Sequence, residues 1–177
     1  MIRFRFAPAK ARAAVQWMLQ EARPQPLDLH TILKACYFAD KDHLNRWGRP
    51  VFGARYRAMR FGPVPVEIYE MLKGEPYWLA ELGAERFPWS LRGFRVHGEN
   101  EPADLDELSP SDRDALTAAF DRARGMTFDQ RTAASHGPDW QKAQLGWMRY
   151  EDMIDPDHPR REEILETLEE ISMRMVL

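Results

Sequence analysis

The sequence predicts a mainly α fold of the α+β class, in which about six helices pack around a small antiparallel β-sheet within a single domain. Apolar residues recur at three- and four-residue spacing in several segments, as in helices with one buried face. Short alternating runs near residues 51–58 and 92–97 predict the strands of the sheet. The length of 177 residues suits one domain over 1–177, with the C-terminal helix over 159–176 as a candidate addition.

Two helices are predicted in the N-terminal third. Phenylalanines alternate with arginines over residues 3–6, as in a short strand or an extended arm, and Pro8 then suits the first turn of a helix that runs to about Ala22. The second helix begins after Asp28, a good N-cap residue, and ends before Gly48. Its apolar face contains Leu29, Ile32, Leu33, Cys36, Tyr37, Leu44 and Trp47.

The middle of the chain combines short strands and helices. Residues 51–59 predict a strand, which the GPVP sequence of Gly62–Pro65 interrupts before a helix from Val66 to Leu72. A short helical turn or loop follows between Pro76 and Pro88, and we expect its aromatic side chains to belong to the core. A second strand is predicted over residues 91–97.

Capping signals define the C-terminal helices. After an acidic loop or edge strand over residues 99–108, Ser109 begins a helix that ends at Gly125. Thr127 and Gln130 form a capping box that starts another helix, which ends at His136. The apolar side chains expected to pack inward after it are Trp140, Leu145, Trp147 and Met148. A last helix is expected to start at Pro159 and to bury Ile164, Leu168, Ile171 and Met175.

Composition and charge limit the class of protein. Hydrophobic residues are 44% and charged residues 30% of the chain, as in soluble globular domains, and one cysteine excludes an internal disulfide and a cysteine-based zinc cluster. No apolar run suggests a signal peptide or a membrane span, so we expect a cytoplasmic protein without a membrane partner. The net charge is +7 over residues 1–97 and −10 over residues 98–177. The two halves either neutralise each other in the fold or leave a basic patch for an acidic partner.

Asp40 is the unusual residue of the second helix, because its spacing places a carboxylate on the apolar face. A buried carboxylate needs a partner. The candidates are the arginines at 55, 57 and 60 and the free N–H groups of the helix that starts near Pro63. We interpret Asp40 as a structural link between helix, strand and loop, with a role in recognition as the alternative.

The motifs around Asp40 resemble the Panacea domain of the SocA-like antitoxins of bacterial toxin–antitoxin systems. The resemblance rests on CYFAD over Cys36–Asp40, on His43-Leu44, on Gly48-Arg49-Pro50 and on AMRFGPVP over Ala58–Pro65. Weaker similarity extends it to residues 1 to about 155, and Val66 departs from the family in place of a small polar cap. The residues that carry the family motif are Tyr37, Asp40, His43, Gly62, Pro63, His136 and Trp140.

This resemblance implies a bacterial or phage antitoxin that binds and neutralises a cognate toxin, with delivery of the toxin to an ATP-dependent (AAA+) protease as a candidate mode. It implies a binding protein without enzymatic activity, cofactor or metal. Two charged surfaces are candidates for partner binding. They are Arg55, Arg57 and Arg60 for an acidic partner, and Glu99, Glu101, Asp104 and Asp106 for a basic one, of which the acidic surface is favoured.

Other functions find weaker support in the residues. Asp40 and His43, with His136 as a third member, could bind a divalent metal or act as a general acid–base pair, but no further ligand is marked by spacing. Cys36 lies on the core face, where a thiolate is disfavoured. A nucleic-acid-binding regulatory protein is the alternative function, through a patch of arginines and aromatic residues: Arg46, Trp47, Arg49, Arg55, Tyr56, Arg57, Arg60 and Phe61.

Overall fold

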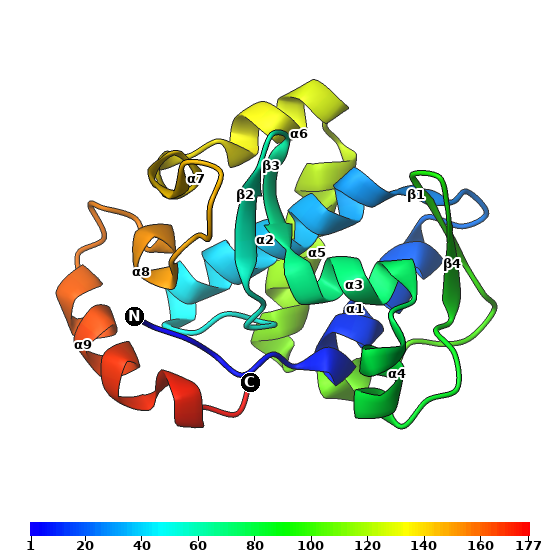
Figure 1. Ribbon diagram of the computed structural model, residues 1–177, viewed down its shortest axis with the longest axis horizontal. Helices are drawn as coiled ribbons and strands as arrows, with labels where there is room; N and C mark the ends of the chain where they lie inside the picture. Colours follow the sequence, from blue (N-terminus) through cyan, green and yellow to red (C-terminus); the bar gives the residue numbers. More distant parts are fainter.

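The computed structural model describes residues 1–177 as a mainly helical α+β fold with nine helices (Figure 1). The helices are α1 (Pro8–Glu21), α2 (Leu29–Trp47), α3 (Val66–Lys73), α4 (Pro76–Leu82), α5 (Pro110–Arg124), α6 (Phe128–Ser135), α7 (Pro138–Ala143), α8 (Tyr150–Met153) and α9 (Arg161–Ile171). The strands are β1 (Leu27–Asp28), β2 (Tyr56–Met59), β3 (Gly62–Pro65), β4 (Trp89–Arg92) and β5 (Arg95–Gly98). The predicted fold class is therefore confirmed, although the short helices raise the number above six.

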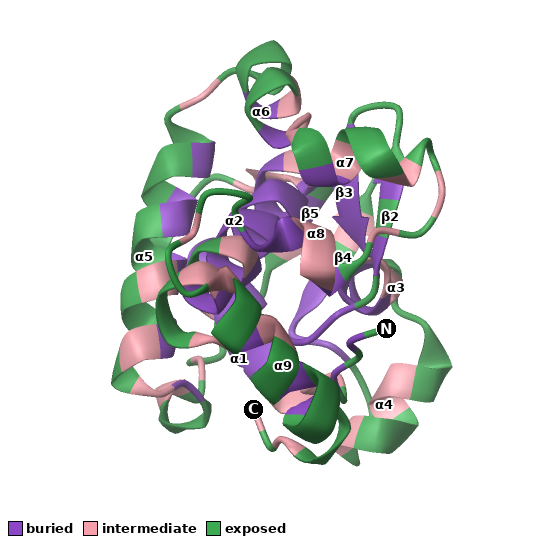
Figure 2. Ribbon diagram, turned by 90° about the vertical axis from the view of Figure 1, so that its left-hand side faces the viewer, coloured by how far each residue is buried: buried purple, intermediate pink, exposed green.

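Helix α2 is the centre of the fold. It packs along α5 on one side and against the β2–β3 hairpin on another (Figure 1). Every residue from Thr31 to Asp40 is buried, including Lys34 and Asp40. Figure 2 shows how burial differs between the helices: α2 is mostly buried, whereas the outer face of α5 and most of α9 are exposed. Interactions made by α2 therefore connect α5, α6, α8, β1 and the β2–β3 hairpin.

Among the sequence-based predictions, the helix caps agree best with the structure. Asp28 accepts a hydrogen bond from the His30 N–H, and Gly48 ends α2 in the left-handed conformation. Ser109 and Thr127 both form complete capping boxes, with Asp112 and Gln130 as their partners. The last helix starts two residues later than expected, at Arg161, and its predicted core residue Ile171 is 41% exposed.

The predicted strands do not share a sheet. β2 pairs with β3 alone, whereas β1, β5 and β4 form a separate three-stranded antiparallel sheet. Residues 51–55 do not extend β2, because the N–H groups of Val51 and Phe52 bind the Asp40 carboxylate and not a neighbouring strand. The N-terminal residues form no strand either and lie in extended conformation beside this loop, where the Ala7 N–H donates to the Phe52 carbonyl.

The GPVP segment was expected to end the strand, and in the structure it forms strand β3. Pro63 and Pro65 lie opposite Ala58 and Tyr56. The Ala58 N–H donates to the Gly146 carbonyl and the Tyr56 carbonyl accepts from the Met148 N–H, so both groups point away from β3. The prolines thus occupy pairs that require no N–H donor from β3, which is where an antiparallel strand tolerates proline.

Near α7, two of the side chains that were predicted to pack into the core are exposed. Trp147 and Leu145, which were expected to pack inward, are 50% and 57% exposed, whereas Trp140 and Met148 are half-buried. Tyr77 on α4, expected in the core, is also exposed. The backbone of Trp147 forms an isolated β-bridge with Arg57 of β2. This pairing leaves the indole of Trp147 outside the core.

Candidate functional site

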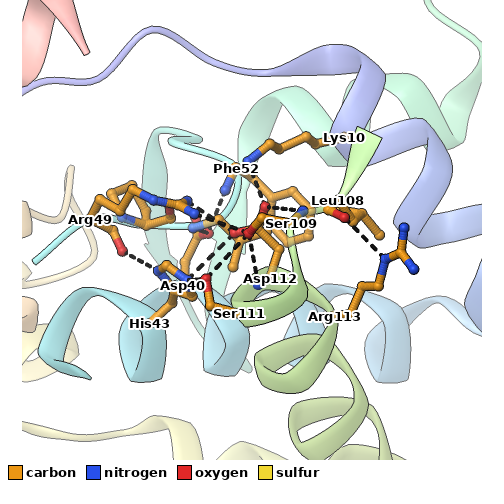
Figure 3. Close-up of polar contacts among 12 residues, drawn as sticks. Lys10, Asp40, His43, Arg49, Phe52, Leu108, Ser109, Ser111, Asp112 and Arg113 are labelled. Atoms are coloured by element: carbon orange, nitrogen blue, oxygen red, sulfur yellow. Dashed lines mark hydrogen bonds and ion pairs between the residues drawn. The ribbon is translucent and has the colours of Figure 1, made fainter. Parts of the chain in front are cut away.

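A cluster of polar side chains, buried except for the half-buried Arg49 and here called the polar centre, joins α1, α2, the loop after α2, and α5 (Figure 3). Its members are Lys10, Asp40, His43, Arg49 and Asp112. Asp112 is its hub, with Oδ2 2.6 Å from Lys10 Nζ and Oδ1 2.9 Å from Arg49 Nη1 and 3.5 Å from His43 Nε2. The hydrogen bond from Lys10 and the charges of Lys10 and Arg49 lower the pKa of Asp112, although burial acts in the opposite direction.

Asp40 occupies the part of the polar centre next to β2. Its Oδ1 accepts hydrogen bonds from the N–H groups of Val51 (2.8 Å) and Phe52 (2.7 Å), and its Oδ2 accepts one from the Tyr56 hydroxyl (2.9 Å). Asp40 therefore links helix, loop and strand, but the predicted arginine and helix-terminus partners are wrong. Complete burial raises the pKa of Asp40 to about 7, against the effect of the three donors.

The proposed constellation of Asp40, His43 and His136 is not assembled. His43 Nδ1 lies 2.7 Å from the Arg49 carbonyl oxygen and Nε2 lies 3.0 Å from Ser111 Oγ, so neither Asp40 nor His136 is its partner. The ring of His136 stacks on Trp140 instead, with 3.6 Å between centroids. No group of three or more histidine, cysteine, aspartate or glutamate side chains in the chain is arranged to hold a metal ion.

A second polar link was missed by sequence reasoning. The Tyr37 hydroxyl donates to Asp139 Oδ2 at 2.6 Å, and Lys41 Nζ lies 3.3 Å from Asp139 Oδ1. These contacts connect α2 to the start of α7. Cys36, one residue earlier, is fully buried, and burial raises the pKa of its thiol, as expected for a core residue.

A groove with a largely apolar lining opens where the N-terminal half of α2 meets the β2–β3 turn. Its volume is about 560 Å³. The residues that line it are Asp28, Leu29, His30, Leu33, Lys34, Met59, Arg60, Phe61, Gly62, Val64, Tyr69, Phe94 and Phe128. We call it the aromatic groove.

Four large apolar side chains of the aromatic groove are exposed to solvent. Phe94 is 79% exposed, and Met59, Phe61 and Phe128 are between 39% and 47% exposed. Phe61 and Phe128 contact each other edge to face at 5.1 Å, and Phe128 also lies 4.2 Å from the ring of His30. The four side chains come from the β2–β3 hairpin, the β4–β5 turn and the first residue of α6. No single segment of the sequence could therefore reveal them as a cluster.

Lys34 forms the polar part of the groove. Its side chain is buried, and Nζ donates to the Pro63 carbonyl at 2.8 Å. Burial, followed by the charge of Arg131, lowers the pKa of Lys34 to about 7. Gly62 is required beside it, because its φ of +104° favours glycine and a Cβ would collide with Lys34 Cε and Ser135 Oγ.

Polar side chains at the groove are linked to α6. Arg131 Nε donates to His30 Nδ1 at 3.0 Å, and its Nη2 lies 3.4 Å from Asp28 Oδ2. Burial, followed by the charge of Lys34, lowers the pKa of His30 to about 4. The imidazole is therefore neutral near pH 7, and the positive charge beside the groove comes from Arg60, Arg131 and, below its pKa of about 7, Lys34.

The three arginines predicted for partner binding divide between two places. Arg55 and Arg57 lie against Trp147, at 5.2 and 5.4 Å from the ring centroid, and Arg55 also pairs with Glu67. Arg60 lies over Phe61 at the aromatic groove. The wider patch of the nucleic-acid hypothesis is not continuous either, because Tyr56 is buried and Arg49 belongs to the polar centre.

The acidic residues predicted for partner binding lie at the surface between β5 and α5. Glu99 pairs with Arg86, and Asp106 Oδ1 is 3.7 Å from Arg113 Nη2. Asp104 caps a short 3₁₀ turn, and the Glu101 carbonyl accepts from Gln20. Ion pairs from Lys10, Lys41, Arg49 and Arg86 to acidic residues after position 98 show that the two halves of the chain neutralise part of each other's charge.

Comparison with protein families gives a match that spans most of these features. A family model described as "Antitoxin SocA-like, Panacea domain" matches residues 32–141, more than half of the chain. The matched range is narrower than the resemblance over residues 1 to about 155, and it includes most of α2, both hairpins, α5 and α6. Searches of curated proteins and of solved structures gave no match. No helix is both long enough and apolar enough to cross a membrane.

Proposed function

Because the chain belongs to the SocA-like antitoxins with a Panacea domain, we propose that it binds a cognate toxin protein and neutralises it. The observation that supports direct binding is the aromatic groove. Monomeric proteins rarely expose several large apolar side chains around one depression, and such surfaces are typical of contacts with other proteins. Ten of the 13 residues that line the groove lie within the range that the family model matches, and Asp28, Leu29 and His30 precede it.

We propose a binding activity and not an enzymatic one. Three of the residues that the sequence offered for catalysis are engaged in the fold, and the fourth, His136, stacks on Trp140 away from them. Asp40 accepts three hydrogen bonds, His43 is held between Arg49 and Ser111, and Cys36 is buried with a raised thiol pKa. The polar centre has the contacts of a structural network, because its charges pair with one another.

Neutralisation has two forms in this proposal. In the first, the antitoxin masks the surface through which the toxin acts. In the second, it is an adaptor that delivers the toxin to an ATP-dependent protease, as the resemblance implies. Both forms require the same complex with the toxin, and they differ in the fate of the toxin after the complex has formed.

The test is co-expression with the products of the neighbouring genes. We expect one small neighbouring protein to co-purify with this chain and to arrest growth when it is expressed alone. Loss of that toxin from cells with an intact protease, but not from protease-deficient cells, indicates the adaptor mode, and a stable complex in both indicates masking. If no neighbouring product binds, the antitoxin proposal is wrong.

The nucleic-acid alternative is separated by a simpler measurement. Binding that depends on a basic surface weakens steeply with salt. If the purified chain is retained on heparin resin at low salt, released at moderate salt and bound to no neighbouring protein, the regulatory function through arginine and aromatic residues is favoured over the antitoxin.

A further inference from the structure

We propose that the aromatic groove receives a segment of the toxin in which a large apolar side chain stands next to a carboxylate, and that the carboxylate binds the ammonium group of Lys34. This inference rests on the proposed function in one respect only, because it takes a protein partner as the natural occupant. It adds the position of the contact and the chemistry of the partner segment.

The apolar part of the inference follows from the exposed rings. Phe61 and Phe128 contact each other at one side of the groove, and Phe94 projects from the β4–β5 turn with 79% of its surface exposed. A buried aromatic side chain contributes strongly to binding because its large area leaves water and its ring contacts other rings edge to face. One aromatic or branched aliphatic side chain fits the volume of about 560 Å³ with room for the adjoining backbone.

The carboxylate of the proposed partner segment is inferred from a comparison of two buried lysines. Lys10 in the polar centre lies 2.6 Å from the carboxylate of Asp112. Lys34 is more deeply buried, with 1% of its surface exposed against 7% for Lys10, yet it has only the Pro63 carbonyl as acceptor and no carboxylate within ion-pair distance. An ammonium group has three donors, and burying its charge without a counter-charge is unfavourable. A carboxylate from the partner supplies both the acceptors and the opposite charge.

The surroundings of Lys34 favour an anion. The charged and titratable groups near it are Arg131 and His136 of the α6 region, Arg60 of the hairpin turn, and His30 and Asp28 at the start of α2. The carboxylate of Asp28 is already engaged by the His30 N–H and by Arg131. Burial lowers the pKa of both histidines, so the charge that remains beside the groove is positive.

A small-molecule probe tests the groove without the toxin. The probe is 3-phenylpropionate, and its neutral match is 3-phenylpropanamide; both are titrated into the protein at pH 6.5 and followed by NMR. We expect the carboxylate to bind about tenfold more tightly than the amide, because only the carboxylate gains the ion pair with Lys34. Lys34→Met should remove this preference, whereas Lys142→Met, at an exposed lysine paired with Asp152, should preserve it.

The pH profile provides a readout that a structural role of Lys34 would not change. The carboxylate of the probe stays ionised above pH 6, whereas the pKa of Lys34 is about 7 in the free protein. Affinity for 3-phenylpropionate should therefore fall as the pH rises from 6 to 9, and the Lys34→Met variant should show no such fall. Equal binding of acid and amide, or the same profile in the variant, would overturn the proposal.

The toxin itself gives the second arm of the experiment. Lys34→Met and Phe94→Ser should each raise the Kd for the toxin by about tenfold, whereas Tyr77→Ser, at an exposed aromatic residue of α4 outside the groove, should not. If the toxin binds all variants equally, the groove is not its site and the antitoxin function stands. If no toxin binds even the wild type, the proposed function fails, and the probe experiment still decides the chemistry of the groove.

Discussion

The polar centre and the aromatic groove each contain a buried lysine, but only the polar centre provides that lysine with a counter-charge from the same chain. In the polar centre, Lys10 and Arg49 pair with Asp112 and the ring of His43 lies beside it, so cations and carboxylate come from the same chain. In the groove, Lys34 has only a carbonyl oxygen and is surrounded by exposed aromatic rings. Burial alone therefore does not distinguish a structural residue from a functional one. The presence or absence of an internal counter-charge does so, because an ion pair closed within the chain leaves nothing for a partner.

The largest expected effect is in the polar centre. Asp112→Ala removes the one carboxylate shared by three basic side chains, and it should lower the free energy of unfolding by about 3–5 kcal/mol, the usual cost of breaking a buried pair. Urea denaturation measures the change. Asp114→Ala, at an exposed aspartate of the same helix α5, should change stability by no more than about 0.5 kcal/mol. Equal effects of the two substitutions would show that Asp112 is not a hub.

Asp40→Ala should have the next largest effect. The substitution leaves the N–H groups of Val51 and Phe52 and the Tyr56 hydroxyl without their acceptor, which should cost about 2–4 kcal/mol. Asp40→Asn keeps an acceptor oxygen in place and should cost less. A thermal melt of Asp40→Ala within a couple of degrees of wild type would remove the structural role and favour a role in recognition.

The two regions should also respond to pH with opposite signs. The pKa of Asp40 is raised from 3.8 to about 7, so between these values the folded chain holds a proton that the unfolded chain has lost, and stability falls as the pH rises. The pKa of Lys34 is lowered from 10.5 to about 7, so between these values the unfolded chain holds the extra proton, and stability rises with pH.

Each slope is bounded by about 1.4 kcal/mol per pH unit for one proton. The measurement is the difference in free energy of unfolding between wild type and Asp40→Asn from pH 4 to 7, and between wild type and Lys34→Met from pH 7 to 10. Pairing each residue with its neutral variant cancels the other titrating groups. Slopes of the same sign would contradict the comparison.

The smallest effect on stability is expected at the rim of the groove. Phe94→Ser changes a side chain that is 79% exposed, so the free energy of unfolding should stay within about 0.5 kcal/mol of wild type. Its effect on toxin binding should nevertheless exceed that of Asp104→Ala. A large loss of stability would mean that Phe94 supports the β4–β5 hairpin and is not a free contact residue.

Local chemistry explains which features could be predicted from the sequence. The caps at Asp28, Ser109 and Thr127 depend on residues within three positions, and all three were identified correctly. The burial of Asp40 followed from the spacing of the apolar residues around it. Its partners could not be predicted in the same way, because backbone N–H groups carry no signature in the sequence.

Long-range contacts explain what was missed. Ser109 was identified as the start of α5, but the contact of Asp112 on this helix with Lys10 spans 102 residues of sequence and has no local signal. The aromatic groove likewise combines residues from β2, β4–β5 and α6. The separate sheets were missed because alternating patterns identify strands but do not specify which strands pair. The predicted contact surfaces at Arg55, Arg57 and the acidic segment remain predictions, to be compared with the groove in the same binding assays.

The position of Asp112 has a consequence for synthesis of the chain. A ribosome produces the N-terminal half first, and domains fold as their residues emerge. Until α5 has emerged, α2 lacks its packing partner, and Lys10, His43 and Arg49 lack their shared carboxylate. The newborn chain at that stage has the net charge of +7 of residues 1–97, reduced to +2 by the five acidic residues between positions 98 and 111. Translation that stops before residue 112 thus leaves Lys10, His43 and Arg49 without their shared carboxylate, so the polar centre can form only after α5 has been synthesised.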